Sequence, residues 1–471
     1  MVSSIEDQIA EVYWIQKSSL ARLNNSSPKE RIDKLRSIEK YMLAHKKELF
    51  DALYEDFKKP ASEVILAELL GVKREIDHIC KNLKSWMKPQ RVDTPLLLLG
   101  TQGYIQPEAK GMCLVIAPWN YPFNLAICPL LLAIAAGNAV MLKPSELSPA
   151  TSTFIKKMIT SLFDRSEVAV FEGDAAVSTH LLEQKFNHIF FTGSPAIGKV
   201  VMKAASEHLC SVTLELGGKS PAIIGPAADI EASAQKIAWG KFLNNGQTCI
   251  APDYVYVHEK HYFAFLEFLE KAVNSFYNPE NKGIQQSKDY ARIVNKRHFA
   301  RVMHLVEDAK LRGANVLFGG DTDENECYIS PTVLTNCNHD MQILQEEIFG
   351  PVLPILVYKD EQQIVDQLAK EEKPLALYIF SENEDFTQYI LKNTSSGGVV
   401  VNDCLIHYGH GELPFGGVNN SGIGKTGGKF GFNEFSNQKS VLVQHSRMMK
   451  FLYPPYKLNV RWMLDFILKW L

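Results

Sequence analysis

Hydrophobic and polar residues follow a helical period in the first part of the chain. Residues 1–90 are rich in charge, and apolar residues recur at intervals of three and four between residues 28 and 58. They are Ile32, Leu35, Ile38, Met42 and Leu49. Residues with this spacing lie on one face of a helix. The pattern predicts an entry layer of amphipathic helices.

Short apolar runs alternate with helical patterns further along. Strand-like runs occupy residues 113–117, 139–143, 186–191, 212–216 and 221–224, and helical patterns cover 124–136 and 195–207. A second such block runs from about 217 to 400, with helical stretches at 232–243, 261–276 and 297–312 and strands near 314–318 and 398–401. Strands that alternate with helices are typical of a doubly wound, parallel α/β sheet.

Two other segments predict structure outside these blocks. The segment LLLLGTQGYIQPEAKG, residues 96–111, predicts a β-hairpin, because its GTQG turn separates two strand-like runs. In the tail, residues 457–471, charged residues recur every four positions at Lys457, Arg461, Asp465 and Lys469. The tail therefore predicts an amphipathic helix, too short and too charged to span a bilayer. Its apolar face would pack on protein, lie on a membrane or cover another subunit.

Composition excludes several classes. The chain has 471 residues, and 50 Lys and Arg nearly balance 53 Asp and Glu, so no nucleic-acid partner is expected. Eight scattered cysteines form no CxxC pair, which favours a reduced, cytoplasmic protein without a metal site. The N-terminus has no basic segment before an apolar core, and no run of about 20 apolar residues occurs. We expect a protein that is neither secreted nor membrane-spanning.

Cys249 lies among small and polar residues in NNGQTCIAPD, residues 244–253. A lone cysteine is usually a small core residue. Here the surrounding Gly, Gln, Thr and Pro residues indicate a shaped loop that could expose a thiolate bordered by backbone N–H groups. The competing interpretation is a cofactor-independent thiol hydrolase or acyltransferase that pairs Cys249 with His407 or His410, near Asp403. A binding or scaffold protein without activity is a second alternative.

Two polar residues follow predicted strands. Glu215, in LELGGK, lies at the carboxyl end of a strand, where α/β sheets place their ligands, although a surface glutamate would also fit. Asn120, in IAPWNYPFN, follows the strand at 113–117, and its amide could donate to an oxyanion or simply form a turn.

Other motifs have the chemistry of a nucleotide site. FFTGSPAIGKV combines a strand, a glycine turn and a helix start, whose free N–H groups can bind pyrophosphate, although it does not match G-x-G-x-x-G. Lys143 and Glu146, in MLKPSE, could meet a phosphate or hydroxyl and a ribose diol. Glu347 and Phe349, in EEIFGP, are ambiguous when considered alone.

Taken together and in this order, seven motifs resemble the aldehyde dehydrogenase superfamily over residues 5–440. They are APWNYP, KPSE, FTGS, ELGGKSP, NNGQTC, EEIFGP and LPFGG. The short N-terminus, the CIAPDYV continuation and the apolar tail are most similar to the class 3 branch, which acts on fatty or aromatic aldehydes.

The resemblance implies an α/β fold with two doubly wound domains and a small β oligomerisation arm. It assigns residues 1–90 and 112–215 to NAD(P) binding, 216–400 to catalysis, 91–111 and 401–440 to the bridging arm, and 441–471 to the amphipathic tail. We also expect a cytoplasmic homodimer, whose amphipathic tail helix can make peripheral membrane contact.

The resemblance implies roles at matching positions. Cys249 is the expected nucleophile, Glu215 the general base, and Asn120 with the Cys249 N–H the oxyanion site. The expected cofactor residues are Trp119, Lys143, Glu146, Gly193, Ser194, Gly198, Gly217, Glu347 and Phe349. Tyr121 and Trp239 match aromatic positions of the substrate funnel, which favours apolar or aromatic aldehydes. Because Glu146 would accept from a ribose 2′-OH, we expect NAD to be preferred and NADP tolerated.

Overall fold

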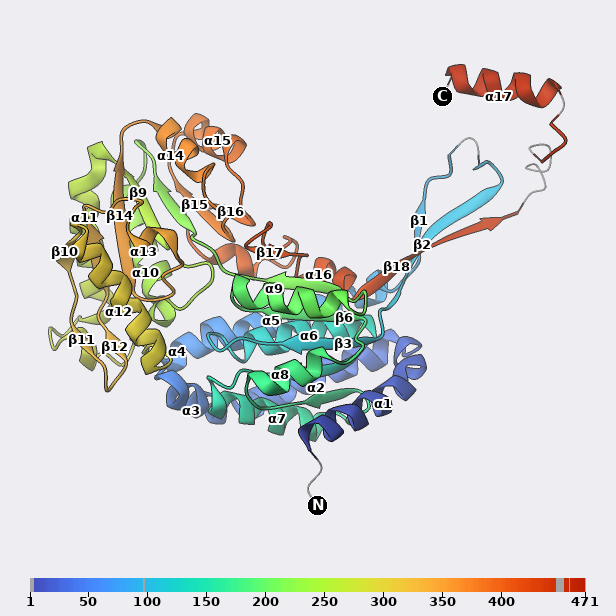
Figure 1. Cartoon of the computed structure of the whole chain (residues 1–471), viewed down its shortest axis with the longest axis horizontal. Coiled ribbons are helices and arrows are strands. Elements are labelled where there is room, and N and C mark those ends of the chain that lie inside the picture. The colour runs from blue at the N-terminus through green and yellow to red at the C-terminus, as the bar shows by residue number, and fades with distance from the viewer. Residues whose placement is uncertain (1–3, 96–97, 446–452, 457, 471) are drawn as a thin grey trace.

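The computed structural model describes residues 4–95, 98–445, 453–456 and 458–470. Two bodies, each built around a sheet, carry an arm that projects away from them, and a helix follows the arm (Figure 1). Both bodies confirm the predicted α/β class.

The six-stranded sheet has the order β17-β7-β6-β3-β4-β5. Its strands β3 to β7 are parallel where they pair, and β17 lies antiparallel beside β7. Their bounds are Met112–Ile116, Ala139–Lys143, Val168–Val170, His188–Thr192 and Ser211–Glu215 for β3 to β7, and Gly422–Ile423 for β17.

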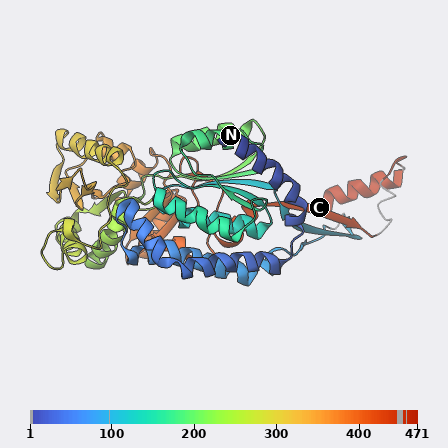
Figure 2. The same cartoon turned by 90° about the horizontal axis from the view of Figure 1, so that it is seen from below.

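Helices cover both faces of this sheet (Figure 2). Successive residues of β3 point to opposite faces, so Leu114 packs with one helix layer and Val115 with the other. The first layer holds α1 (Ile5–Asn24), α8 (Ala175–Leu182) and α9 (Pro195–Ser206). The second holds α2 (Pro28–Ala44), α3 (Lys46–Phe57), α5 (Leu70–Trp86), α6 (Asn124–Ala136), α7 (Pro149–Leu162) and α16 (Gly428–Glu434). The short α4 (Ala61–Glu63) and η1 (Val64–Leu69) lead into α5.

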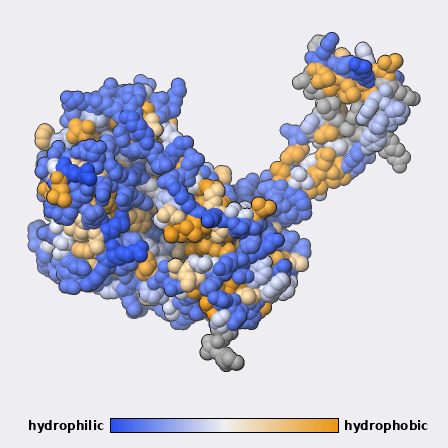
Figure 3. Space-filling model, in the orientation of Figure 1, coloured by the Kyte–Doolittle hydropathy of each residue, from blue (hydrophilic) through white to orange (hydrophobic). Residues whose placement is uncertain are grey.

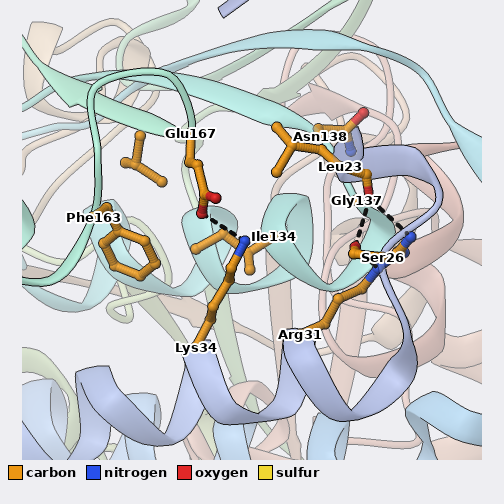
Figure 4. A pocket seen from close by; sticks show the side chains of 10 residues that line it. Leu23, Ser26, Arg31, Lys34, Ile134, Gly137, Asn138, Phe163 and Glu167 are labelled. Atoms are coloured by element: carbon orange, nitrogen blue, oxygen red, sulfur yellow. Dashed lines mark hydrogen bonds and ion pairs between the residues drawn. The ribbon is translucent and has the colours of Figure 1, made fainter. Parts of the chain in front are cut away.

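Arg31, on α2, links that helix to the carboxyl ends of α1 and α6 (Figure 4). Its guanidinium donates to the carbonyls of Ala135, Leu23 and Asn24 and to the Ser26 hydroxyl. The adjoining cavity, of about 10 Å³, has room for about one water molecule. Since the guanidinium N–H groups already donate to carbonyls at helix ends, Arg31 has a structural role in this pocket.

The seven-stranded sheet has the order β10-β13-β14-β9-β8-β15-β16. Its strands are β8 (Pro221–Ile224), β9 (Tyr254–His258), β10 (Asn315–Phe318), β13 (Thr332–Thr335), β14 (Val352–Tyr358), β15 (Ala376–Phe380) and β16 (Gly398–Val401). One face packs on α10 (Ile230–Phe242) and α11 (Tyr262–Tyr277). The other packs on α12 (Lys296–Leu311), α13 (Gln342–Gln345), α14 (Glu361–Leu368) and α15 (Glu384–Asn393).

Short elements connect these layers. They are η3 (Leu243–Gly246), η4 (Glu259–His261), η5 (Ile284–Gln286), η6 (Ile406–Gly409), and the paired strands β11 (Thr322–Asp323) and β12 (Tyr328–Ile329).

The projecting arm is a three-stranded antiparallel sheet of order β1-β2-β18. Its strands are Gln90–Val92, Thr101–Ala109 and Ser436–Gln444. The hairpin predicted with a GTQG turn is therefore wrong, because Thr101 to Gly103 lie inside β2, where β18 pairs with them. The turn occurs earlier, at residues 98–100, and residues 96–97 lie outside the described part of the chain.

Two further expectations are resolved. The helical stretch predicted at 28–58 is two helices separated at His45. The tail forms the predicted helix, α17 (Leu458–Trp470), with Arg461, Asp465 and Lys469 on it, whereas Lys457 lies outside the described residues.

Candidate active site

The loop that presents Cys249 begins with three successive residues of left-handed backbone. Asn244, Asn245 and Gly246 have φ values of 53°, 58° and 73°. Asparagine tolerates this region better than most residues, and a Cβ on Gly246 would lie 2.3 Å from the Gly350 carbonyl oxygen. We name residues 243–249 the cysteine turn. Its backbone is fixed by both local conformation and close packing.

Buried amides hold the cysteine turn in place. The Gln247 side chain donates to the Asn244 and Arg292 carbonyls and accepts from the Val294 N–H. The Asn245 amide donates to the Ala291 carbonyl. These bonds give the side-chain N–H groups buried partners and help to hold the turn in a conformation that is unfavourable by itself, although the side-chain oxygens of Asn244 and Asn245 have no partner in the described chain.

Asn120, in the loop that follows β3, contacts the cysteine turn. Its side-chain amide, which is buried, donates to the Gln247 carbonyl at 3.0 Å. Its own carbonyl accepts from the Asn244 amide at 2.9 Å and from Lys59 at 3.0 Å. The structure therefore brings the predicted oxyanion donor to the loop that carries Cys249, with one amide N–H left for a ligand.

Lys59 and Glu68 form a fully buried ion pair of 2.7 Å beneath this contact. The Glu68 carboxylate also accepts from the Asn124 N–H, and Lys59 lies 4.1 Å from the centre of the Tyr121 ring. Sequence reasoning missed this pair, because isolated charges in a helical segment predict a solvated surface. A buried pair of this kind is costly to break, so it fixes the Asn120 loop.

The two predicted carboxylates gather around the thiol. Cys249 is half-buried, and its pKa is raised by burial and by the negative charges of Glu347 and Glu215. Burial raises the pKa of Glu215 to about 8, opposed by Lys425 and reinforced by Glu434. A base with a pKa near operating pH can take a proton from a nucleophile or a water molecule.

Glu347 lies against the glycines that follow Glu215. A Cβ on Gly217 would lie 2.1 Å from Glu347 Oε2, and the Gly218 N–H donates to the carboxylate. Burial and Asp253 raise the pKa of Glu347 to about 8. The glycines therefore leave space for the half-buried Glu347 carboxylate, whose charge acts on the Cys249 thiol.

An aromatic group lies next to Glu347. Phe349 has φ 47° and meets the Trp119 ring edge-on at 5.4 Å, and the His298 ring lies 5.0 Å from Trp119. The strained backbone at Phe349 brings its ring to Trp119, which follows β3. The two predicted cofactor residues are thus neighbours in space.

The remaining predicted cofactor residues follow neighbouring strands. The Gly193 N–H donates to the Glu215 carbonyl at 3.0 Å, and the Ser194 hydroxyl caps α9 by accepting from Ile197. A Cβ on Gly198 would approach Leu216 to 2.8 Å, so this glycine lets α9 pack closely. After β4, Lys143 and Glu146 form an ion pair of 2.6 Å.

Aromatic side chains form the apolar side of the site, and two of them carry hydroxyl groups that are hydrogen-bonded. Trp239 and Cys249 pack on one hydrophobic cluster together with Tyr408. The Tyr408 hydroxyl donates to Asn124 at 3.0 Å, and sequence reasoning did not identify it. Tyr121, expected to line the substrate path, is buried with its hydroxyl bonded to Thr248 at 2.7 Å, one residue before the nucleophile.

The alternative of a cysteine–histidine pair has little support. The His407 ring packs against Phe415 and Tyr378, and burial lowers the pKa of His407 to about 4. His410 is exposed, and Asp403 accepts from the Cys404 N–H.

The chain is similar to known aldehyde dehydrogenases over nearly its whole length. A model of the aldehyde dehydrogenase family matches residues 4–441. The chain is 43% identical over 428 residues to 4,4′-diaponeurosporen-aldehyde dehydrogenase of Staphylococcus aureus (91% of this chain, 92% of the relative). It is 41% identical over 443 residues to aldehyde dehydrogenase family 3 member A2 of Pongo abelii (93% and 90%).

Two more matches bear on assembly and fold. Dimeric NADP-preferring aldehyde dehydrogenase of Canis lupus familiaris is 41% identical over 428 residues (90% of this chain, 93% of the relative). The solved structure of the substrate-bound state of Staphylococcus aureus AldH has a TM-score of 0.92 and 40% identity, covering 98% of this chain and 99% of that one.

Proposed function

The chain belongs to the aldehyde dehydrogenase family and is an NAD(P)-dependent aldehyde dehydrogenase, and we propose that it oxidises apolar aliphatic or aromatic aldehydes through a thioester on Cys249. One observation carries the proposal: Asn120 bonds to the turn that holds Cys249, and the carboxylates of Glu215, which is buried, and Glu347, which is half-buried, act on the Cys249 thiol. In this assignment the six-stranded body binds the cofactor and the seven-stranded body supplies the nucleophile.

Cys249 attacks the aldehyde carbon as a thiolate. Since burial and two carboxylates raise its pKa, the thiol needs a base, and Glu215 is suited to accept the proton. The carbonyl oxygen becomes an oxyanion, which the Asn120 amide and the Cys249 N–H stabilise with hydrogen bonds. Loss of hydride from the carbon then leaves a thioester.

Once the proton taken from Cys249 has passed to solvent, Glu215 completes the cycle by activating water. As a carboxylate it takes a proton from a water molecule, which attacks the thioester carbon, and the carbon–sulfur bond breaks to release the carboxylic acid. One Glu215 carboxylate oxygen is buried and lacks a hydrogen-bond partner in the described chain. A buried unpartnered oxygen supports a role in holding a water molecule or a proton.

The residues at the strand ends fit a dinucleotide. Ser194 caps the start of α9, where free N–H groups suit a pyrophosphate, and Ile197 and Val200 on α9 are more than half exposed. Figure 3 shows apolar surface in this region, suited to the flat face of a base. Lys143 and Glu146 would hold the adenine ribose, and Glu347 and Phe349 the nicotinamide ribose and ring. When bound, NAD(P) accepts the hydride.

The Glu146 carboxylate supports a preference for NAD. It would accept from a ribose 2′-OH and repel a 2′-phosphate, although its partner Lys143 offsets part of this repulsion. We expect a higher kcat/KM with NAD than with NADP, and Glu146→Gln should narrow the ratio. Equal or better kcat/KM with NADP in the wild type would contradict the assignment.

The substrate class is tested with a panel of aldehydes. Trp239 and Tyr408 pack against the same hydrophobic cluster as Cys249, which favours apolar chains and rings. We expect kcat/KM, followed by cofactor reduction, to be highest for medium or long-chain and aromatic aldehydes. A maximum at acetaldehyde or at a charged semialdehyde would overturn this substrate class.

The arm and α17 suit contacts outside the chain. β18 is an edge strand of nine residues, and Leu442 on it is exposed. Figure 3 shows apolar surface along the arm. A long open edge favours pairing with a second copy, so we infer a homodimer. Within the described residues no helix has the length and apolar character to cross a bilayer. Light scattering of the intact chain measures the oligomeric state directly.

A further inference from the structure

The turn after the LPFGG motif lies beside the general base. The strand β17 pairs with β7 so that Gly422 is opposite Glu215, and the Leu216 N–H donates to the Ser421 carbonyl at 3.1 Å. Lys425 follows this strand by two residues. Backbone pairing therefore fixes where Lys425 begins relative to Glu215.

The Lys425 side chain is held by this turn. Its ammonium donates to the Gly416 carbonyl at 2.5 Å and to the Gly417 carbonyl at 3.2 Å. Gly416 has φ 150°, and a Cβ there would lie 3.0 Å from Lys425 Cδ. The glycine leaves space for the aliphatic chain, and two of the three ammonium N–H groups have acceptors.

Glu434 holds the other side of the same turn. Its carboxylate accepts from the Lys425 N–H at 3.2 Å and from the Thr213 hydroxyl at 3.1 Å. Thr213 is on β7, two residues before Glu215. A cation and an anion are thus both anchored near the base.

These two charges act on Glu215 in opposite directions. The positive charge of Lys425 lowers the pKa of Glu215, whereas burial and Glu434 raise it, and Glu215 in turn raises the pKa of Lys425, which burial lowers. Glu215 itself acts on the ionisation of the Cys249 thiol and the Tyr408 hydroxyl. An opposite charge favours the ionised form of a buried acid.

We propose that Lys425 is a positioning residue for the general base: its ammonium stabilises the ionised Glu215 and so sets the pH at which the thioester is hydrolysed. This inference rests on the proposed role of Glu215. Glu434 opposes Lys425, so the pair defines the charge state of the base without touching the substrate.

The test is the pH dependence of steady-state turnover between pH 6 and 10, with the burst of reduced cofactor followed in parallel. Lys425→Met removes the charge and keeps most of the side-chain length. We expect the midpoint of the pH–turnover profile of this variant to move up by about one pH unit, so that turnover falls roughly tenfold at neutral pH and recovers at high pH. Lys425→Arg should restore the wild-type midpoint. Glu434→Gln should move the midpoint down.

The alternative outcomes separate the two hypotheses. A loss that is equal at every pH, with an unchanged midpoint, means that Lys425 only supports the turn and overturns the inference. Should Lys425→Met fail to fold, Lys425→Gln provides the same comparison. If Glu215→Gln keeps the wild-type rate and midpoint, Glu215 is not the base, and the proposed function fails irrespective of Lys425.

Discussion

The cysteine turn and the projecting arm place their side chains in opposite ways. In the turn, polar Asn244, Asn245 and Gln247 are fully buried. On the arm and α17, apolar side chains are exposed, and Trp462 is 72% exposed. The amide N–H groups of the turn have their partners within the chain, whereas the arm and α17 expose apolar surface that another molecule would cover. The residues that position the nucleophile are therefore buried within the chain, whereas the apolar residues of the arm and α17 are exposed for contact with another molecule.

The strongest test of this contrast is Cys249→Ala. We expect a loss of turnover of roughly four orders of magnitude or more, because no other group can form the thioester. Cofactor binding should persist, since the cofactor residues are elsewhere. The matched control is Cys80→Ala, a half-buried cysteine on α5 that should keep wild-type turnover. Turnover by the Cys249 variant would assign the nucleophile elsewhere.

Glu215→Gln is expected to act on the second half-reaction. Steady-state turnover should fall by about 10²- to 10³-fold. A burst of reduced cofactor should remain, though slowed if Glu215 also deprotonates Cys249, and mass spectrometry should find an acyl adduct on Cys249. In the wild type, turnover should rise with pH through about 8, because the carboxylate form is the base. A Glu215 variant with the wild-type rate would show that another group hydrolyses the thioester.

Local patterns predicted the elements of the two bodies well. The strands Ala139–Lys143, Pro221–Ile224 and Gly398–Val401 and the helix Asn124–Ala136 have the predicted bounds. Each is a contiguous apolar run or pattern between clear breaks. The arm was less predictable, because the β2 register is set by β18, more than 300 residues later in the chain. Long-range pairing leaves no local signal.

The sequence motifs predicted the residues assigned to catalysis, but not the buried or partly buried charged residues that hold them in place. The predicted Asn120, Glu215, Glu347 and Cys249 lie close together, whereas Lys59, Glu68 and Lys425 gave no signal in the sequence. Their roles depend on burial and on partners distant in sequence. The left-handed backbone at Asn244 and Asn245 was also invisible, since asparagine adopts it only where the surroundings supply hydrogen bonds.

Lys241 tests how far the interior tolerates charge next to the cysteine turn. It is fully buried, its amine has no hydrogen-bond partner in the described chain, and burial lowers its pKa to about 8. A folded pKa below the unfolded value means that stability present at high pH is lost as pH falls through about 8. Lys241→Met should therefore be more stable below pH 8, on the order of 2 kcal/mol, with the gain shrinking towards pH 10.5. Urea denaturation at pH 7 and pH 10 measures this difference. Equal gains at both values would show that packing, not charge, is responsible.

Asn245 tests the strain in the turn itself. Asn245→Ala removes the bond to the Ala291 carbonyl and leaves a β-carbon residue at φ 58°. We expect a loss of about 1–2 kcal/mol in the free energy of unfolding. Asn245→Gly loses the same bond, but glycine adopts left-handed backbone without strain. This variant should therefore be less destabilised than Asn245→Ala. If alanine is the more stable of the two, left-handed backbone is not what makes Asn245 important.

The smallest effect on chemistry is expected from the tail, and it tests the other side of the comparison. Arg461, Asp465 and Lys469 form a charged stripe on α17, while Trp462, Leu464, Phe466 and Leu468 are exposed. Such a helix suits a dimer partner or a membrane surface. Truncation after Tyr453 should leave kcat/KM within about twofold for a short, soluble aromatic aldehyde, because no group assigned to the chemistry lies beyond that point. Co-sedimentation with anionic vesicles and light scattering, each done with the intact and truncated chains, then identify the surface: loss of vesicle binding indicates a membrane, and loss of dimer indicates a partner subunit. If a truncated, folded enzyme has lost turnover, α17 contributes to the active site, and the separation between the buried turn and the outer arm does not hold.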